Sequence, residues 1–422
     1  MQEEIDVSQN FFEDIQEAPQ DQAHKTFFQE NFSPKQIGSI AKYIEPVSAN
    51  VSAEYLSSLF KDDEELRAIP IEQNDSVIGI VERRAILEAT NTTWKRLTSK
   101  NIIDYVEPFH ESLNANDYIE KTLGEISKIN RQTGSVFFPV YSRRRFLGLV
   151  SLDGFLDKMD QLRAQDLAKA AAIQKSFMPS SDTKFGSCEL RSWNKMANEL
   201  GGDIYQAIKL DDTKSMICCF DVSGKNVAAS LLTIAVGSFF KMIRVLPKDA
   251  LQPEKIISML DEFLQDSVPM GNFITAAICC FDEEKRRISI YNCGHTNVYA
   301  IIKNESGANG KMAVIEPTFP PMGMGAVSEQ IKNSKDGKNG ATVLPFKDCL
   351  HINLYSDGFT DMKNNDGERY EDDRAKDFFI NLYRVKDGDV EEKIQGEVTE
   401  WIQNAMLPDD VTVLDLRLKS IA

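Results

Sequence analysis

Acidic residues stand beside turns or glycines at several places where a strand-like apolar run begins or ends. Each one alone is an ordinary turn or cap residue. The set is more informative, because strand ends in one layer of a fold can bring their carboxylates together. The positions are Asp203 after a glycine pair in GGDIY, Asp221 at the end of SMICCFD, Asp357 between HINLYS and Gly358, and Asp409 and Asp410 ahead of VTVLDLRL.

Such a cluster of carboxylates points to metal chemistry. Carboxylates that lie close together repel one another and need positive charge nearby. Ligand sets made only of oxygen select hard cations such as Mg²⁺, Mn²⁺ or Ca²⁺. Two such ions about 3.5–4 Å apart lower the pKa of a bridging water and direct the resulting hydroxide at phosphorus. The pattern therefore favours a metal-dependent phosphoryl hydrolase.

Composition limits the other classes of function. The chain has 422 residues, 42% of them hydrophobic, and a net charge of -17. This is a typical composition for two or three globular domains, and the negative charge argues against nucleic acid or an anionic membrane as the main partner. No signal peptide or apolar run of membrane-spanning length is present. Seven cysteines without a CxxC pair indicate reduced core thiols in a cytoplasmic protein. The four histidines include no metal-type pair.

The first half of the chain contains an internal repeat. Residues 69–87 (IPIEQNDSVIGIVERRAIL) align without gaps on residues 138–156 (FPVYSRRRFLGLVSLDGFL), with Pro70 to Gly79 and Pro139 to Gly148 at the same spacing. Each copy is expected to form strand, turn, strand and helix start, after an amphipathic helix. Residues 45–157 resemble a paired cystathionine-β-synthase (CBS) module. That family implies two β-α-β units and, in many members, a bound adenosine nucleotide.

The CBS resemblance has one departure. Nucleotide-binding members usually carry Ser or Thr three residues before an Asp, whereas Asp153 follows Ser151 by two. A sensory or dimerising module is expected, and adenosine nucleotide binding stays open. Residues 158–180 then lack Gly and Pro until Pro179, which predicts a connector helix, either dimeric or simply the first helix of the next domain.

The second half of the chain resembles the stage-II-sporulation-E-like serine phosphatases, the bacterial branch of the protein phosphatase 2C superfamily. The motifs GGDIY, DVSGKNVAASLL, YNCGHTNVYAI, LYSDGFTDMKNNDGERYEDDR and PDDVTVLDLRL occur in that family's order across about residues 165–420. The resemblance implies a β-sandwich flanked by helices, and hydrolysis of phosphoserine or phosphothreonine on a protein by a water activated between two Mn²⁺ or Mg²⁺ ions. Anti-sigma-factor antagonists are common substrates in this family.

The resemblance also implies roles for the acidic residues. Asp221 would bridge both metals, and the Val222 carbonyl would bind one of them. Asp357 and Asp409 would complete the second metal site, and Asp203 would act at the water shell, which makes these four aspartates the catalytic set. Asp410 is a weaker ligand candidate.

The family motifs are not fully matched. Lys225 and Asn226 replace the usual His-Gly, and Cys293 replaces a usual Ala. Lys225 is interpreted either as a contact for substrate phosphate or as a solvated lysine. His295 is interpreted either as a catalytic acid or as a structural residue. None of these changes removes a predicted metal ligand.

The expected architecture is a multidomain α/β and α+β protein. It has a partly disordered segment 1–44 with a short helix near 21–32, the tandem CBS-like module 45–157, the connector 158–180, and an α-β-β-α phosphatase domain 181–422 in which 304–345 forms a hairpin and a mobile surface loop. A homodimer, a phosphoprotein substrate and a small-molecule ligand of the CBS-like pair are expected. Two alternatives stay open: a catalytically silent phosphatase fold that holds a partner protein, and a Ca²⁺-binding structural protein, which the absence of a DxDxDG loop disfavours.

Overall fold

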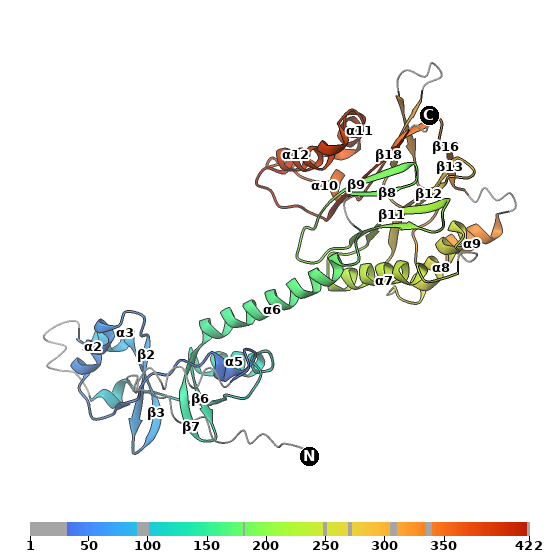
Figure 1. Ribbon diagram of the computed structural model, residues 1–422. Helices are drawn as coiled ribbons and strands as arrows, with labels where there is room; N and C mark the ends of the chain where they lie inside the picture. Colours follow the sequence, from blue (N-terminus) through green and yellow to red (C-terminus); the bar gives the residue numbers. More distant parts are fainter. Residues whose placement is uncertain are drawn as a thin grey trace, which may run out of the picture. The chain divides into compact units, whose positions relative to one another are not determined.

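The computed structural model describes residues 32–90, 101–179, 182–247, 251–268, 272–303, 310–334 and 340–419. The chain divides into two compact units, Met1–Asp166 and Leu167–Ala422 (Figure 1). Helix α6 (Leu152–Lys175) begins in the first unit and ends in the second. Within the described residues, we find no helix with the length and apolar character needed to span a membrane.

Unit 1 contains two copies of one sequence of elements. The first copy consists of β1 (Val47–Ser48), α2 (Ala53–Asp62), β2 (Ala68–Gln73), β3 (Ser76–Glu82) and α3 (Arg83–Thr90). The second consists of β5 (Leu113–Asn114), α5 (Ile119–Thr133), β6 (Phe137–Ser142), β7 (Arg145–Ser151) and the start of α6. In each copy the short first strand pairs in parallel with the next strand, which then forms an antiparallel hairpin. The predicted strand pairs and the helices before them are confirmed.

The repeated glycines have a common physical reason. Gly79 lies opposite Ile71 and Gly148 lies opposite Val140, at equivalent positions in the two hairpins. A Cβ atom on Gly79 would lie 2.3 Å from the Glu107 carbonyl oxygen, in the added edge strand β4 (Glu107–Pro108). A Cβ on Gly148 would lie 2.3 Å from the carbonyl oxygen of Lys42. In both copies a neighbouring backbone therefore approaches where only glycine leaves room.

The N-terminal segment contributes to unit 1 where it is described. A short 3-10 helix spans Ile37–Ser39, and the Ile37 side chain is fully buried in the same core as Phe138 and Val140. The helix predicted near 21–32 lies outside the described residues except for its last position.

Helix α6 begins six residues before the predicted start of the connector at 158. Its first turns complete the core of the second copy, because Phe155, Met159 and Leu162 are buried there. A glycine inside a helix, here Gly154, costs about 1 kcal/mol. Burial of three large apolar side chains is worth more than that, so the helix continues through the glycine.

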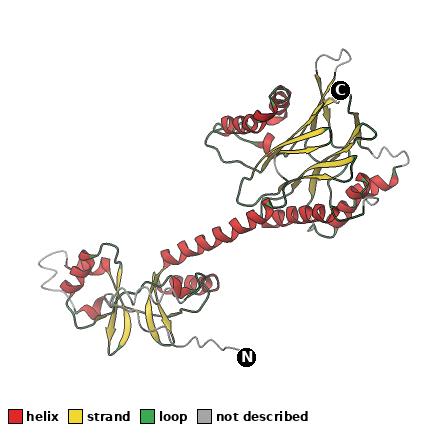
Figure 2. Ribbon diagram, viewed as in Figure 1, coloured by secondary structure: helices red, strands yellow, loops and turns green. Residues whose placement is uncertain are grey.

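Two antiparallel sheets form the centre of unit 2 (Figure 2). The first has the order β10-β11-β12-β13-β16 and the second the order β15-β14-β17-β18-β9-β8. The strands of the first sheet are β10 (Asp203–Lys209), β11 (Lys214–Val222), β12 (Ile274–Asp282), β13 (Arg287–Cys293) and β16 (Thr342–Pro345). Those of the second are β15 (Gly310–Ile315), β14 (Val298–Lys303), β17 (Cys349–Tyr355), β18 (Val411–Leu418), β9 (Cys188–Lys195) and β8 (Asp182–Phe185).

The sheets are apolar on both faces, as β11 illustrates. Met216, Cys218 and Phe220 pack with the helices, while Ile217 and Cys219 face the core between the sheets. Side chains alternate between the two faces of a strand, so this continuous apolar run is buried from both sides. All seven cysteines are buried and free, as core-filling thiols.

Helices cover the outer face of each sheet. The first sheet packs against α7 (Val227–Ile243) and α8 (Pro253–Gln265). The second packs against α11 (Glu371–Leu382) and α12 (Val390–Ile402), with the short α10 (Gly358–Asp361) beside them. Unit 2 therefore has four layers in the order helices, sheet, sheet, helices.

The segment 304–345 is more ordered than expected where it is described. β15 forms the predicted hairpin with β14. The helix α9 (Ala326–Asn333), however, takes the place of part of the predicted surface loop. Its start is fixed by a tertiary contact, because the Asp261 carboxylate of α8 accepts hydrogen bonds from the N–H groups of Gly323 and Ser328, both at 2.8 Å. That contact is not visible in the local sequence.

Candidate active site

The first sheet contributes Asp203 and Asp221. Asp203 is the first residue of β10, and Asp221 lies one residue before the end of β11. The two strands are antiparallel and pair these residues directly. Like charges in that arrangement are unfavourable without a counter-charge. The predicted positions at strand ends are thus confirmed, and the two carboxylates are brought to the same end of the sheet.

The second sheet contributes Asp357 and the Asp409–Asp410 pair. β17 ends at Tyr355, two residues before Asp357, and β18 begins directly after Asp410. Backbone pairing continues past the strand ends, since the Ser356 N–H donates to the Thr412 carbonyl at 3.0 Å. The Ser356 hydroxyl also donates to the Asp410 carbonyl at 3.2 Å. These bonds hold the two acidic turns side by side.

Asp410 connects the second sheet to the loop that precedes β10. Its Oδ1 accepts a hydrogen bond from the Ala197 N–H at 2.7 Å, and its Oδ2 accepts one from the Gly202 N–H at 2.6 Å. Both carboxylate oxygens are therefore engaged in positioning the residues next to Asp203. These two bonds give Asp410 a structural role in this part of the fold.

Thr412 makes a second connection between the sheets. Its hydroxyl donates to Asp203 Oδ2 at 2.6 Å and accepts from the Asn194 side-chain amide at 2.7 Å. Thr412 is fully buried and Asp203 nearly so. A hydrogen bond to a buried carboxylate fixes its orientation, so the Asp203 side chain is held in one position by residues of β18 and β9.

The carboxylates act on one another electrostatically. Burial, followed by repulsion from Asp357, Asp409 and Asp410, raises the pKa of Asp221 to about 7. Burial and the Asp221 charge raise the pKa of Asp203 well above its ordinary value. Burial and Asp409 also raise the pKa of Asp357. Carboxylates from both sheets thus form one electrostatic cluster.

Two glycines make room at this cluster. A Cβ on Gly358 would lie 1.9 Å from the Asp410 carbonyl oxygen, so the turn after Asp357 closes on the Asp409–Asp410 turn only with glycine there. A Cβ on Gly202 would lie 2.8 Å from the Val222 carbonyl oxygen, the predicted backbone ligand. The glycines next to the acidic residues are therefore required by close packing.

The cluster contains the type of donor group that hard divalent metal ions prefer. Among the described residues, no three carboxylate, thiol or imidazole side chains are grouped closely enough to hold a metal ion as they lie. The cluster does hold a cationic group, because Lys225 Nζ lies 2.8 Å from Asp409 Oδ2. Carboxylates that raise one another's pKa and already attract a cation fit a hard divalent ion.

His295 contacts Thr275, which pairs with Asp221 in the first sheet. Its Nδ1 is 2.8 Å from the Thr275 hydroxyl, and its Nε2 is buried with no hydrogen-bond partner among the described residues. Burial lowers the pKa of His295 to about 4. A side chain that is only 4% exposed and neutral at physiological pH is suited to packing, not to proton donation. The geometry favours the structural interpretation.

Sequence reasoning missed several residues that organise the site. Thr412 lies in the same motif as Asp409, but its contact with Asp203 could not be expected from spacing. Gln174 of α6 is another: its side-chain amide donates to the Gly201 carbonyl at 2.6 Å, and its Oε1 accepts from the Gly201 N–H at 3.3 Å. Its position near the end of the predicted connector helix was visible in the sequence, but its partner was not.

Known proteins provide an independent comparison. Residues 211–419, all within unit 2, match the family described as Stage II sporulation protein E (SpoIIE). Over 282 residues the chain is 22% identical to Protein IcfG of Synechocystis sp. (strain ATCC 27184 / PCC 6803 / Kazusa), in an alignment that covers 60% of this chain and 42% of that protein. The chain therefore spans less than half of that relative.

Solved structures of two other proteins are similar. The SiaA-PP2C domain of Pseudomonas aeruginosa gives a TM-score of 0.49 at 16% identity, over 62% of this chain and 99% of that one. The PP2C phosphatase domain with a fragment of the regulatory domain of SpoIIE from Bacillus subtilis gives a TM-score of 0.40 at 16% identity, over 56% of this chain and 64% of that one. The family match covers most of unit 2, including Asp221, Asp357 and Asp409, and it supports a phosphatase domain of the SpoIIE type there.

Proposed function

We propose that this protein is a metal-dependent protein serine/threonine phosphatase. The observation that supports this best is the convergence of Asp203, Asp221, Asp357 and Asp409 from two sheets into one electrostatic cluster. Such a cluster destabilises a fold unless cations bind to it. The match of residues 211–419 to the SpoIIE family supports a catalytic use of the cations that would bind there.

Four residues from the two sheets and their turns would hold the metal ions. Asp221 would lie between two Mn²⁺ or Mg²⁺ ions, with the Val222 carbonyl, Asp357 and Asp409 as further ligands. When bound, these ions supply positive charge and lower the pKa of water, which allows attack on a phosphomonoester. Asp203, fixed by Thr412, would accept a hydrogen bond from water in the metal shell. Asp410 would serve mainly to hold the Gly202 loop.

The substrate would be a phosphorylated regulatory protein. The resemblance to the SpoIIE-like phosphatases suggests an anti-sigma-factor antagonist or a protein of similar kind. We place the reaction in the cytoplasm, where buried free thiols are expected. A homodimer is part of the same proposal.

Unit 1 would regulate this activity as a CBS-like pair. The repeated order of elements supports the assignment. A cavity of about 620 Å³ in unit 1 is lined by both copies, and across it Arg67 of the first copy pairs with Asp153 of the second at 3.3 Å. We propose that this cavity binds a small ligand, with an adenosine nucleotide as the first one to test.

The direct test is phosphate release from a phosphoserine protein by the full chain, with and without Mn²⁺. We expect Mn²⁺-dependent release that Asp357→Asn abolishes. If the chain binds Mn²⁺ and the phosphoprotein but releases no phosphate, the catalytically silent scaffold replaces the enzyme. Adding ATP, ADP or AMP to the same assay tests the regulatory part, since a nucleotide that binds unit 1 should change the rate.

A further inference from the structure

Lys225 reaches the acidic cluster from the first sheet. It follows β11, whose Asp221 lies four residues earlier, and it precedes Asn226, whose side chain caps α7 by accepting a hydrogen bond from the Ala229 N–H at 3.1 Å. The end of β11 and this cap hold the backbone on the two sides of a turn through Gly224, which has a φ of 104°. The lysine is thus anchored at its base while its long side chain stays free to move.

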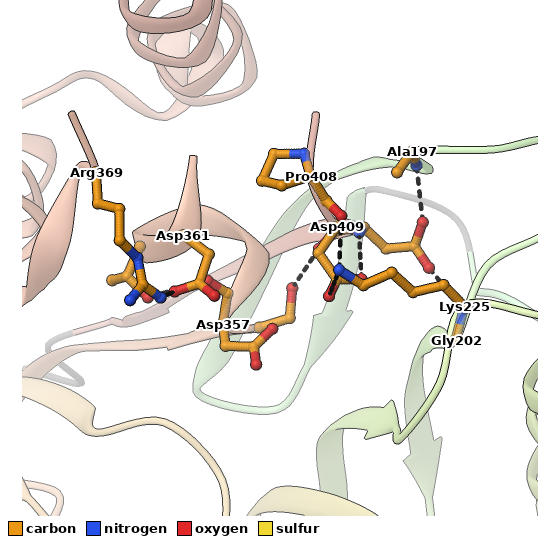
Figure 3. Close-up of polar contacts among 11 residues, drawn as sticks. Ala197, Gly202, Lys225, Asp357, Asp361, Arg369, Pro408 and Asp409 are labelled. Carbon is orange, nitrogen blue, oxygen red and sulfur yellow. Dashed lines mark hydrogen bonds and ion pairs between the residues drawn. The ribbon is translucent and has the colours of Figure 1, made fainter. Parts of the chain in front are cut away.

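The ammonium group of Lys225 makes two contacts with the turn that precedes β18 of the second sheet (Figure 3). Nζ lies 2.8 Å from Asp409 Oδ2 and donates to the Pro408 carbonyl at 2.7 Å. Lys225 and Pro408 are 183 residues apart in the chain. The Lys225 side chain is 53% exposed, whereas that of Asp409 is 26% exposed. A solvent-accessible ammonium group therefore contacts a partly buried carboxylate that is a predicted metal ligand.

Lys225 also influences the other carboxylates. The hydrogen bond to Asp409, followed by the attraction of Asp409 and Asp357, raises the pKa of Lys225, which stays protonated. Its charge in turn opposes the rise in the pKa of both Asp221 and Asp357. The ammonium thus partly neutralises the cluster, although its single charge is less than the cluster carries.

We infer that Lys225 is an internal counter-ion that competes with the metal for Asp409 and so sets the metal affinity of the site. The inference rests on the proposed function, in which Asp409 is a ligand. The ammonium takes up a lone-pair site of Asp409 Oδ2 and repels a divalent cation beside it, so the two cations compete for this carboxylate. A lysine ammonium is a point charge on a flexible stem, so it can turn away and leave Asp409 to the metal.

Removing the lysine charge should therefore tighten metal binding. The ammonium and a metal ion close to it repel each other, and this repulsion is stronger in a partly buried site than in water. Together with the lost competition, this predicts about fivefold to tenfold tighter Mn²⁺ binding by Lys225→Met. Lys225→Arg keeps the charge and the pairing, and its affinity should stay within about twofold of the wild type.

The experiment is a calorimetric titration of the full, metal-free chain with Mn²⁺. The matched control is Lys209→Met, because Lys209 lies at the other end of β10 from Asp203 and makes one exposed ion pair with Asp212 at 3.2 Å. This control should bind Mn²⁺ like the wild type. Melting temperatures give a second readout: Lys225→Met should melt below the wild type without metal, since it leaves Asp409 unpaired, and saturating Mn²⁺ should remove or reverse the difference.

The outcomes separate this inference from the proposed function. If wild type and Lys225→Met both bind Mn²⁺ with equal affinity, or the variant binds more weakly, the counter-ion role is wrong while the phosphatase assignment stands. If the wild type binds no Mn²⁺ and releases no phosphate, the proposed function is wrong and the inference falls with it. Tighter binding by Lys225→Met, with unchanged Lys209→Met, supports it.

Discussion

Asp203 and Asp221 are paired directly across two antiparallel strands, and Asp203 is almost completely buried. Both lie on the face of the first sheet that is turned toward the second sheet, because Tyr205 and Cys219, two residues away on the same strands, are buried between the sheets. The pairing places two acidic groups where a fold selected only for stability would place one or none. Repulsion between the two carboxylates should therefore destabilise the metal-free protein, and bound metal ions should remove this destabilisation.

Asp221→Asn should stabilise the metal-free protein. The folded-state pKa of Asp221 is about 7, above the value of about 3.9 expected in the unfolded chain. The unpaired charge therefore favours unfolding increasingly as the pH rises from about 4 to about 7. Thermal denaturation in EDTA near pH 8 should show a gain on the order of 2 kcal/mol, and the gain should shrink near pH 5. If the metal-free variant is less stable than the wild type at both pH values, repulsion among these carboxylates does not destabilise the fold.

Thr412→Val should weaken both the fold and the catalysis. The substitution removes the hydroxyl between Asp203 and Asn194 and leaves a buried carboxylate and a partly buried amide without this partner. The expected cost is about 1–3 kcal/mol in the free energy of unfolding, measured by denaturant titration, together with slower phosphate release. Thr412→Ser keeps the hydroxyl and should recover most of the activity; if Ser and Val are equally impaired, the methyl group and not the hydrogen bond is what matters.

Gly358→Ala should be much more damaging than an alanine in an open position. The new Cβ would meet the Asp410 carbonyl oxygen at 1.9 Å, and that oxygen belongs to backbone that cannot move without moving Asp409. We expect a loss of about 3 kcal/mol or more and loss of Mn²⁺ binding. Gly396→Ala is the control, because nothing lies within 4 Å of that Cβ in α12 and a helix gains up to about 1 kcal/mol from the change.

His295→Asn should make the protein less sensitive to acid. The folded-state pKa of His295 is about 4, whereas the unfolded chain takes up a proton below about pH 6.5. Between these values the unfolded state binds more protons, so acidification from pH 6.5 to 4 favours unfolding by roughly 3 kcal/mol through this residue. Asn keeps a polar atom near the Thr275 hydroxyl and has no charge to gain.

The measurement for this prediction is the free energy of unfolding from about pH 7 to pH 4. Other groups titrate in the same range, with Asp221 acting in the opposite direction, so the informative quantity is the difference between wild type and variant at each pH. The free energy of unfolding of the wild type should fall relative to that of the variant as the pH falls from about 6.5 to 4. A difference that stays constant would show that His295 has the same pKa in the folded and the unfolded state.

The sequence predicted the strand ends and their acidic residues well, because each signal was local. Apolar runs such as SMICCF, followed by Asp and Gly, identify a buried strand and its turn whatever the rest of the chain does. The two copies in unit 1 could be predicted equally well from the sequence. Gly79 and Gly148 mark them, because a neighbouring backbone leaves no room for a side chain at either position.

The missed features depend on contacts between distant segments. Lys225 and Pro408 are far apart in sequence, as are Thr412 and Asp203, so their hydrogen bonds follow from sheet order and not from spacing. The helix α9 depends on the Asp261 carboxylate of α8. The early start of α6 depends on burial of Phe155, which outweighs the weak helix preference of Gly154.

Helix α6 has a practical consequence for dividing the protein. Its buried residues Phe155, Met159 and Leu162 belong to the core of unit 1, whereas Gln174 near its end is hydrogen-bonded to Gly201 beside the active site. A cleavage point before Leu162 would strip the first core of its last helix and leave apolar side chains exposed on the second fragment. A cleavage point after Gln174 would release the Gly201 loop. Only the short stretch around Leu167 permits two fragments that each retain the side chains they need, and limited proteolysis that yields two stable pieces should cut there.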